Sequence, residues 1–454
     1  MWHSLKNQKI MKKLLLTVSL IGLTSVLNAQ WTSQATGFSD ASRGLGEIKI
    51  VNANTVWGIA YDGSGLGTDI QEFTRTTDGG NSWTPGIIDV GNLTLKITNI
   101  SPVSATTAWV GAFDDVAGLG GVFKTSDGGL TWEAQNSAAY TTTGVSWFNI
   151  VHFFNENVGI TMGDPIGTGL GEFEIYRTTD GGNNWTALSA AALPNPLSGE
   201  YGYNGGYDFA GGSLWFTTNK GRLYRTTDSG VTWTVSQAPI TDFGAAAQNG
   251  TATFSDANNG FLLKNVVSGA VTTRTYATTT NGGTTWTTPV AFTGTRFIIN
   301  YIPGTTTLVA TSAAVPVGTS ISNNNGATWT EVEALEQRGA SAFLNGSTGW
   351  CAGFSTDALT DGVFKLTSPL GTENFENTNT FKVFPNPANS VITISSTNVD
   401  SYSLTVTDLS GKIVMTKSLN GIENTIDLST LSTGAYLFEL RSDKGKEVIK
   451  ILKN

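Results

Sequence analysis

The sequence predicts an all-β protein, a seven-bladed β-propeller followed by a small immunoglobulin-like β-sandwich. An eight-residue motif recurs six times, with its tryptophans 43 to 53 residues apart. A period of that length with one aromatic residue per unit is typical of propeller blades. Short strand patterns also recur in the same order within each repeat. After residue 380 the composition changes, which indicates a second domain.

The motif reads Ser/Thr-x-Asp-x-Gly-x-x-Trp, and its first copy runs from Thr76 to Trp83. A short Asp or Asn side chain can accept hydrogen bonds from nearby backbone amides, and glycine supplies the positive φ of a tight turn. The tryptophan begins the next strand, where its ring can pack between neighbouring sheets. Two positions of each copy are therefore expected to be structural. They are Asp78, Asp127, Asp180, Asp228, Asn281 and Asn324, with Trp83, Trp132, Trp185, Trp233, Trp286 and Trp329.

The six copies resemble the Asp-box, or BNR repeat, of sialidases, certain xyloglucan hydrolases, sortilin-type receptors and photosystem II assembly-factor-like propellers. The resemblance covers roughly residues 48 to 367. In those families the box closes the turn between the third and the outer strand of a blade. Their functions differ widely, so the resemblance implies a fold and no particular activity.

The strand patterns within the repeats predict how the ring closes. In the first blade, apolar strand patterns at 48–51, 56–59 and 72–75 lead into the box. A seventh pattern, from Ala342 to Leu366, stops without a box, while residues 30–37 look like a lone outer strand. We expect these residues to complete the seventh blade, which would leave no open sheet edge. The propeller is thus predicted over residues 30–367.

The N-terminal segment, residues 1–29, is predicted to be a secretory signal peptide whose true start is Met11. Two lysines precede the apolar run 14–23, and Leu27-Asn28-Ala29 forms a small-residue cleavage site. The run is too short to span a membrane. We expect no transmembrane segment in the mature chain.

Residues 381–454 resemble a type A sorting domain of the type IX secretion system of Bacteroidetes. The resemblance rests on a Pro-Asn-Pro opening at 385–387, an Asp-Leu-x-Gly-Lys hairpin at 408–412, a Gly-x-Tyr strand at 434–436 and a basic end. It implies a small β-sandwich that is cleaved on export, and the secretion machinery as partner. It also implies passage through the periplasm to the cell surface or the medium. Residues 368–380, polar with proline and glycine, are predicted to be a linker.

Composition excludes several functions. Residues 30–380 hold 28 acidic and 14 basic residues, a net charge of −14, which disfavours nucleic acid as a partner. Cys351 is the only cysteine, so no internal disulfide forms. The mature chain has one histidine, His152, expected to line the central channel or the core. No pattern indicates a metal site or a cofactor; a calcium ion is conceivable but nothing points to one.

Sialidase activity is not expected. Sialidases bind a carboxylate with three arginines. In this chain three of the arginines stand immediately before a box: Arg75, Arg177 and Arg225. That is a repeated position, and it suggests a structural role.

Two groups of residues are candidates for ligand binding. Acidic residues follow the second strands of several blades, and strand alternation places their loops on the face opposite the boxes. They could bind a cation, a sugar or a basic partner, or simply cap Asp-Gly turns. The loop 199–208 carries three tyrosines among glycines, which could stack on a ligand or pack over the blade junction. The candidates are Asp62, Asp114, Asp164 and Asp357, with Tyr201, Tyr203 and Tyr207.

These observations favour a secreted or cell-surface propeller that serves as a non-catalytic binding or scaffold module for a glycan or a protein. The alternative is a glycoside hydrolase or polysaccharide-binding protein acting on extracellular polysaccharide. Hydrolysis needs two carboxylates about 5–10 Å apart, a separation that the sequence does not give.

Overall fold

The structure is a computed structural model. It describes residues 31–67, 69–116, 118–138, 140–142, 146–166, 171–367, 381–396, 401–408, 412–442 and 445–454. The chain divides into two compact units, with the boundary between residues 371 and 372. The predicted signal peptide and linker lie outside the described residues. Within the described part, no helix is long and apolar enough to cross a membrane.

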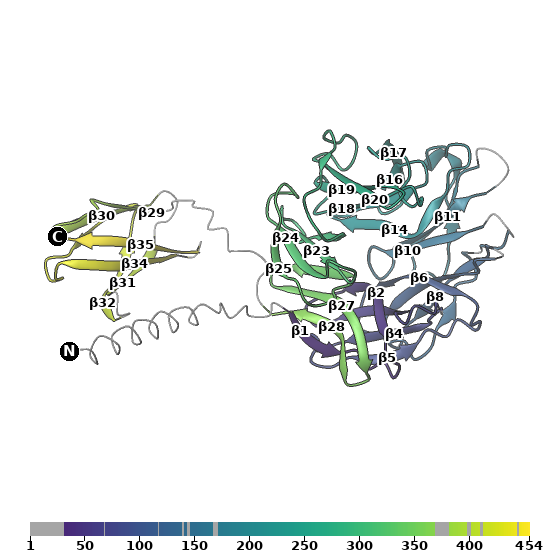
Figure 1. Cartoon of the computed structure of the whole chain (residues 1–454), viewed down its shortest axis with the longest axis horizontal. Helices are drawn as coiled ribbons and strands as arrows, with labels where there is room; N and C mark the ends of the chain where they lie inside the picture. The colour runs from purple at the N-terminus through teal and green to yellow at the C-terminus, as the bar shows by residue number, and fades with distance from the viewer. Residues whose placement is uncertain are drawn as a thin grey trace, which may run out of the picture. The chain divides into compact units, whose positions relative to one another are not determined.

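The first unit consists of seven antiparallel blades, of which the first and the seventh join in one eight-stranded sheet (Figure 1). Each blade has four strands, named inner, second, third and outer. Blade one comprises β2 (Arg43–Ile50), β3 (Val56–Asp62), β4 (Glu72–Thr76) and β5 (Thr84–Ile87).

The following five blades repeat this order. Their strands are β6 (Lys96–Pro102), β7 (Ala108–Phe113), β8 (Gly120–Thr125) and β9 (Glu133–Ala134); β10 (Phe148–Phe153), β11 (Gly159–Pro165), β12 (Phe173–Thr178) and β13 (Thr186–Ala187); β14 (Gly202–Ala210), β15 (Ser213–Thr218), β16 (Arg222–Thr226) and β17 (Thr234–Gln237); β18 (Gln248–Phe254), β19 (Gly260–Ser268), β20 (Val271–Thr279) and β21 (Val290–Ala291); and β22 (Ile298–Tyr301), β23 (Leu308–Ser312), β24 (Gly318–Ser322) and β25 (Thr330–Glu333). A single 3₁₀ turn, Ala190–Ala192, is the only helical element assigned among the described residues.

The seventh blade closes the ring. It combines β26 (Ser341–Asn345), β27 (Thr348–Asp357) and β28 (Thr360–Leu366) with β1 (Trp31–Ala35) from the other end of the propeller. β1 pairs antiparallel with β28 over all five of its residues, from Trp31 opposite Leu366 to Ala35 opposite Gly362. In Figure 1, the green strand β27 lies beside the purple strand β2, and a bridge between Gly44 and Phe354 links blades seven and one.

The core of the propeller lies between neighbouring blades. The second strands of four blades each carry a fully buried tryptophan: Trp57, Trp109, Trp215 and Trp350. The tryptophans of the boxes cover the outer part of these cores. Trp132, for example, packs edge-on against Phe73 of the preceding blade, with ring centroids 6.1 Å apart. A box thus joins two blades through its ring while it closes the turn of its own blade.

The six boxes share one pattern of hydrogen bonds, which the second box illustrates. In blade two, the Thr125 hydroxyl donates to Asp127 Oδ1 over 2.8 Å and accepts from Gly129 N over 2.8 Å. Asp127 Oδ1 accepts from Thr131 N over 3.0 Å, and Oδ2 accepts from the Thr131 hydroxyl over 2.6 Å. These bonds to the charged carboxylate, from the Thr131 side chain first, lower the pKa of Asp127 to about 2.

The two boxes with asparagine keep this pattern by reversing one bond. Nδ2 of Asn281 donates to the Thr285 hydroxyl over 2.8 Å, while its Oδ1 still accepts from Thr285 N over 2.9 Å. A hydroxyl can donate or accept. The box therefore tolerates Asp or Asn, but needs a short side chain with a carbonyl-type oxygen.

The second unit is a β-sandwich. One sheet contains β29 (Phe381–Phe384), β30 (Val391–Ser396) and β33 (Glu423–Asp427). The other contains β32 (Ile413–Asn420), β31 (Ser401–Asp408), β34 (Gly434–Ser442) and β35 (Gly445–Lys453). Ile392 and Ile426 of the first sheet share one apolar core with Leu404, Phe438 and Ile451 of the second. This core is separate from those of the propeller, so the unit has its own source of stability.

The closing strand yields the first prediction. Trp31 is 3% exposed, and its Nε1 donates to Thr319 over 3.2 Å. Trp31→Ala should lower the free energy of unfolding by about 3–5 kcal/mol, because it leaves a large cavity between blades six and seven. Denaturant unfolding of the purified protein measures this. Thr32→Ala, at an exposed position of the same strand, is the control. A loss below about 1 kcal/mol would show that the ring does not depend on β1.

The boxes yield the second prediction. Asp127→Ala should lower the melting temperature by several degrees, since it removes the acceptor of four hydrogen bonds, whereas Asp127→Asn should be almost neutral at pH 7. The folded pKa of Asp127 lies below its ordinary value, so its charge stabilises the fold above about pH 4 and this gain disappears toward pH 2. Asp127→Asn should therefore lose less stability than the parent between pH 4 and pH 2. Equal damage from Ala and Asn would contradict the role given to the oxygen.

Candidate functional site

The boxes and the candidate site lie on opposite faces of the propeller. Gly79 N of the first box donates to Asn54 O over 2.9 Å, in the turn between β2 and β3. Gly128 and Gly181 make the equivalent bonds to Thr106 O and Asn157 O, both over 2.9 Å. The turns after the inner strands and the boxes thus share one face. Because the strands alternate in direction, the loops after the second and outer strands lie on the other face, which we call the loop face.

The loop face holds a pocket of about 570 Å³ at the junction of blades two, three and four. Its wall combines aromatic rings with a carboxylate and two amides. The lining residues are Phe113, Trp147, Asn149, Asp164, Tyr201, Gly202, Tyr203 and Asn204. We call it the aromatic pocket. Three of the seven candidate residues, Asp164, Tyr201 and Tyr203, therefore come together.

Asp164 is the carboxylate of the aromatic pocket. Its Oδ1 accepts from Asn149 Nδ2 over 2.6 Å and from Gly202 N over 2.8 Å. Burial raises the pKa of Asp164 to about 6, although both of these bonds act in the opposite direction. No other donor to this carboxylate is found in the described part of the chain, which leaves Oδ2 available to a ligand.

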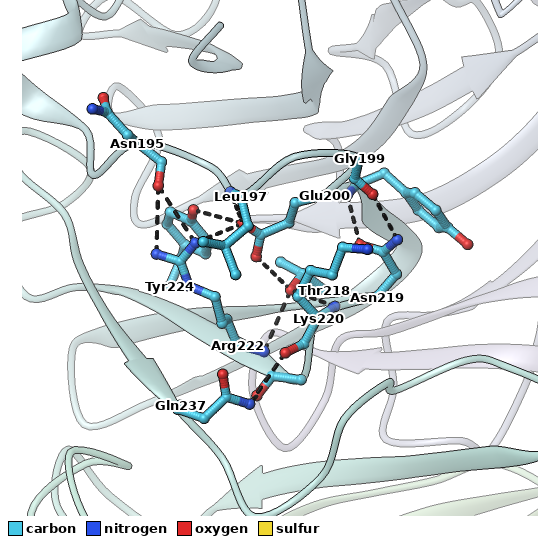
Figure 2. A network of polar contacts seen from close by, with 12 residues as sticks. Asn195, Leu197, Gly199, Glu200, Thr218, Asn219, Lys220, Arg222, Tyr224 and Gln237 are labelled. Carbon is cyan, nitrogen blue, oxygen red and sulfur yellow. Dashed lines mark hydrogen bonds and ion pairs between the residues drawn. The ribbon is translucent and has the colours of Figure 1, made fainter. Parts of the chain in front are cut away.

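A buried charge network surrounds Glu200, the residue that precedes Tyr201 in the chain (Figure 2). The Glu200 side chain has no exposed surface and accepts from Leu197 N, the Thr218 hydroxyl and Arg222 Nη1, each over 2.7 Å. The next residue, Tyr201, donates its N–H to Asn219 Oδ1 over 2.8 Å. A buried carboxylate with three good donors fixes its backbone firmly. Tyr201, a residue that is 44% exposed, is thus presented on a rigid support.

Tyr203 is positioned by an irregularity of strand β14. Gly202 pairs with Thr218 and Tyr207 with Phe216, so the four residues between Gly202 and Tyr207 bulge out of the ladder. The Tyr203 hydroxyl donates to Asp242, and its ring meets that of Tyr201 edge-on at 5.6 Å. Burial, together with this carboxylate, raises the pKa of Tyr203 above its usual range, so the hydroxyl stays protonated.

For Tyr207, the expectation of a loop is wrong. Residues from Gly202 onward form β14, the inner strand of blade four, and Tyr207 is part of this strand. Its hydroxyl accepts from Asn99 Nδ2 over 3.3 Å, and Lys49 Nζ lies 4.6 Å from its ring centre. It belongs to a polar cluster of the inner strands and not to the aromatic pocket.

His152 also faces this central cluster. Its ring packs against Phe154, Tyr207 and Phe209, with ring centroids 4.8, 5.7 and 4.5 Å apart. Burial, with a smaller contribution from the Lys49 ammonium, lowers the pKa of His152 to about 3. The imidazole is therefore neutral and serves as a packing group.

The other three acidic candidates cap their own loops. Asp62 Oδ1 accepts from Ser64 N over 2.9 Å, Asp114 Oδ1 from Val116 N over 2.8 Å, and Asp357 Oδ1 from Leu359 N over 2.8 Å. None of them lines the aromatic pocket. No group of three or more metal-ligating side chains occurs among the residues that the structure describes.

Sequence reasoning missed four lining residues, Phe113, Trp147, Asn149 and Asn204. Trp147 could have been recognised from the sequence as a candidate, because it is a tryptophan outside the boxes that directly precedes an inner strand. Asn149 could not, since a polar residue inside an apolar strand pattern is equally compatible with a hydrogen bond across the sheet.

Two family models match parts of the chain. Residues 382–454 match the secretion system C-terminal sorting domain. Residues 114–249 match the photosynthesis system II assembly factor YCF48. A comparison with functionally curated proteins gave no match.

Several solved structures are similar to this chain. YCF48 bound to D1 peptide is 12% identical, with 75% of this chain and 97% of that one covered and a TM-score of 0.48. YCF48 from Cyanidioschyzon merolae is 17% identical, with coverages of 74% and 98% and a TM-score of 0.48. The GH74 enzyme of Niastella koreensis is 14% identical, with coverages of 90% and 66% and a TM-score of 0.44.

The repeated boxes, the ring of blades and the matched C-terminal segment agree with one another. The chain is a BNR-repeat β-propeller that ends in a sorting domain of the type IX secretion system, which directs it to the cell surface or the medium.

Proposed function

We propose that the propeller binds carbohydrate outside the cell and that the aromatic pocket is its binding site. The observation that carries this proposal is the pocket of about 570 Å³, in which the exposed Tyr201 and three more buried aromatic residues line the same space as the carboxylate of Asp164. A volume of this size suits a small ligand or one to two units of a polymer.

The chemistry of the lining favours a sugar. Tyr201 and Trp147 offer flat apolar faces, which pack well against the C–H faces of a sugar ring. Asp164, Asn149 and Asn204 supply acceptors and donors that can pair with hydroxyl groups. Tyr201 adds little entropic cost on binding, because the network around Glu200 already fixes its backbone.

Glycoside hydrolysis is the second candidate function. A carboxyl group with a pKa of about 6 suits a general acid, and Asp164 has this property. Hydrolysis also needs a second carboxylate about 5–10 Å away. Among the described lining residues, Asp164 is the one carboxylate. This favours binding over hydrolysis.

A glycan array with the purified protein, run beside reducing-end assays on the same polysaccharides, tests the proposal. Tyr201→Ala should weaken binding of the best array ligand by about tenfold, the equivalent of about 1.4 kcal/mol of lost stacking. Tyr61→Ala, an exposed tyrosine outside the pocket, should leave affinity unchanged. Undiminished binding by Tyr201→Ala would place the site elsewhere, and released reducing ends would favour the hydrolase.

The ionisation of Asp164 can be measured independently of any ligand. Its folded pKa of about 6 lies above the ordinary 3.8, so ionising it costs stability as the pH rises from about 4 to about 6. Asp164→Asn removes this cost. The melting temperature of the variant, relative to the parent, should therefore rise across that pH range and then stay level. A difference independent of pH would show that Asp164 titrates normally.

The sorting domain should affect export and not stability of the propeller. Its core shares no residue with the propeller cores. In a host with a type IX system, deletion of residues 381–454 should leave the propeller in the periplasm, with a melting temperature within about 2 °C of the parent. Cell fractionation and thermal unfolding measure the two effects. Delivery to the surface without these residues would contradict the role of the domain.

A further inference from the structure

A second pocket, of about 420 Å³, lies on the loop face between blades four and five. Two lysines, two glutamines and one threonine provide its polar lining: Lys220, Lys264, Gln237, Gln248 and Thr241. No carboxylate lines it among the described residues. We call it the lysine pocket.

The cations of the lysine pocket are unusual within this propeller. Residues 31–367 contain fourteen lysines and arginines. Twelve of them pair with a carboxylate, donate to a backbone carbonyl or lie over an aromatic ring: Arg43, Lys49, Arg75, Lys96, Lys124, Arg177, Arg222, Arg225, Arg274, Arg296, Arg338 and Lys365.

The remaining two are Lys220 and Lys264. Their ammonium groups have no such partner among the described residues, and both are half-buried. Both line the same pocket, although they are 44 positions apart in the chain. Two ammonium groups without counter-charges in an acidic protein make a local attractor for an anion.

The pocket wall is built so that it holds its shape. Gln237 Nε2 lies 2.9 Å from Gly221 O and 3.1 Å from both Lys220 O and Ile240 O, which ties the two loops together (Figure 2 shows Lys220 and Gln237). Gln248 Oε1 accepts from Thr241 N over 2.9 Å, which leaves its amide N–H groups for a ligand.

The two pockets share their supports. Tyr201, of the aromatic pocket, donates its N–H to Asn219, the neighbour of Lys220 (Figure 2 shows Asn219 and Lys220). Tyr203, of the same pocket, bonds Asp242, the neighbour of Thr241, which lines the lysine pocket. One extended ligand could therefore contact both pockets.

We propose that the lysine pocket binds the anionic group, carboxylate or sulfate, of an acidic polysaccharide whose adjoining sugar occupies the aromatic pocket. This rests on the proposed carbohydrate binding and adds the charge class of the ligand. It also explains how a propeller with a net charge of −14 over residues 30–380 can hold an acidic polymer, since the attraction is local.

The test compares matched ligands by calorimetry at low salt. Tetragalacturonic acid is set against its methyl ester, and a sulfated carrageenan tetrasaccharide against its desulfated form. The parent protein should bind at least one anionic member about tenfold more tightly than its neutral partner, and the pair that shows this preference identifies carboxylate or sulfate. Added salt should reduce the preference.

Variants of Lys220 and Lys264 test whether these lysines cause the preference for the anionic saccharides. Lys220→Gln with Lys264→Gln should abolish it while affinity for the neutral saccharide stays within twofold. Each single variant should reduce it partly, which keeps the test usable if the double variant folds poorly. Lys417→Gln, an exposed lysine of the sorting domain, should have no effect.

Two results overturn the inference. One is equal affinity of the parent for the charged and neutral members of both pairs; the other is a preference that survives in a stable double variant. Binding of the neutral saccharides that is sensitive to Tyr201→Ala would then leave the proposed function intact. Absence of any saccharide binding, on the array and by calorimetry, would overturn the proposed function as well.

Discussion

A ring of sheets is stable only when its last blade meets its first, and here a single strand provides that closure. β1 pairs along its whole length with β28. Blade seven then contacts blade one through Ser42 N, which donates to Ser355 O over 2.8 Å, and through the bridge between Gly44 and Phe354. The pocket geometry depends on this closure, because the aromatic pocket is assembled from three blades whose angles are set by the complete ring.

The contacts between successive blades explain why an arginine stands immediately before several of the boxes. Arg75 lies 5.0 Å from the ring centre of Trp57 and donates to Ala105 O of the next blade. Arg225 lies 5.2 Å from the ring centre of Trp215 and donates to Ala257 O over 2.7 Å. These arginines act on the box face, far from the loop-face pockets, and link blades through desolvated hydrogen bonds. Lys124, Arg177 and Lys365 donate in the same way to Gly181 O, Ser229 O and Gly79 O of the neighbouring blades.

The features that the sequence predicted best are those encoded locally. A box needs only a short polar side chain and glycines at positive φ, such as Gly79 at 72° and Gly80 at 87°, so eight residues are enough to recognise it. The aromatic pocket could not be predicted from local sequence patterns alone. The bulge after Gly202 depends on the register between β14 and β15, which no local pattern reveals, and this is why Tyr207 was expected in a loop. Trp147 stands out in the sequence as a tryptophan outside the boxes, but its place in the pocket depends on how three blades pack together.

The closing pair also sets the order in which the molecule can be completed. Ser33 and Asp361, which bond across it, are 328 positions apart, so the first strand has no partner until the last strand exists. The sorting domain follows β28 directly in the chain order. A chain that is cut short before β28 therefore lacks both a closed ring and an export signal. Because the sorting domain lies behind the closing strand, truncation of the chain at any blade removes the export signal as well.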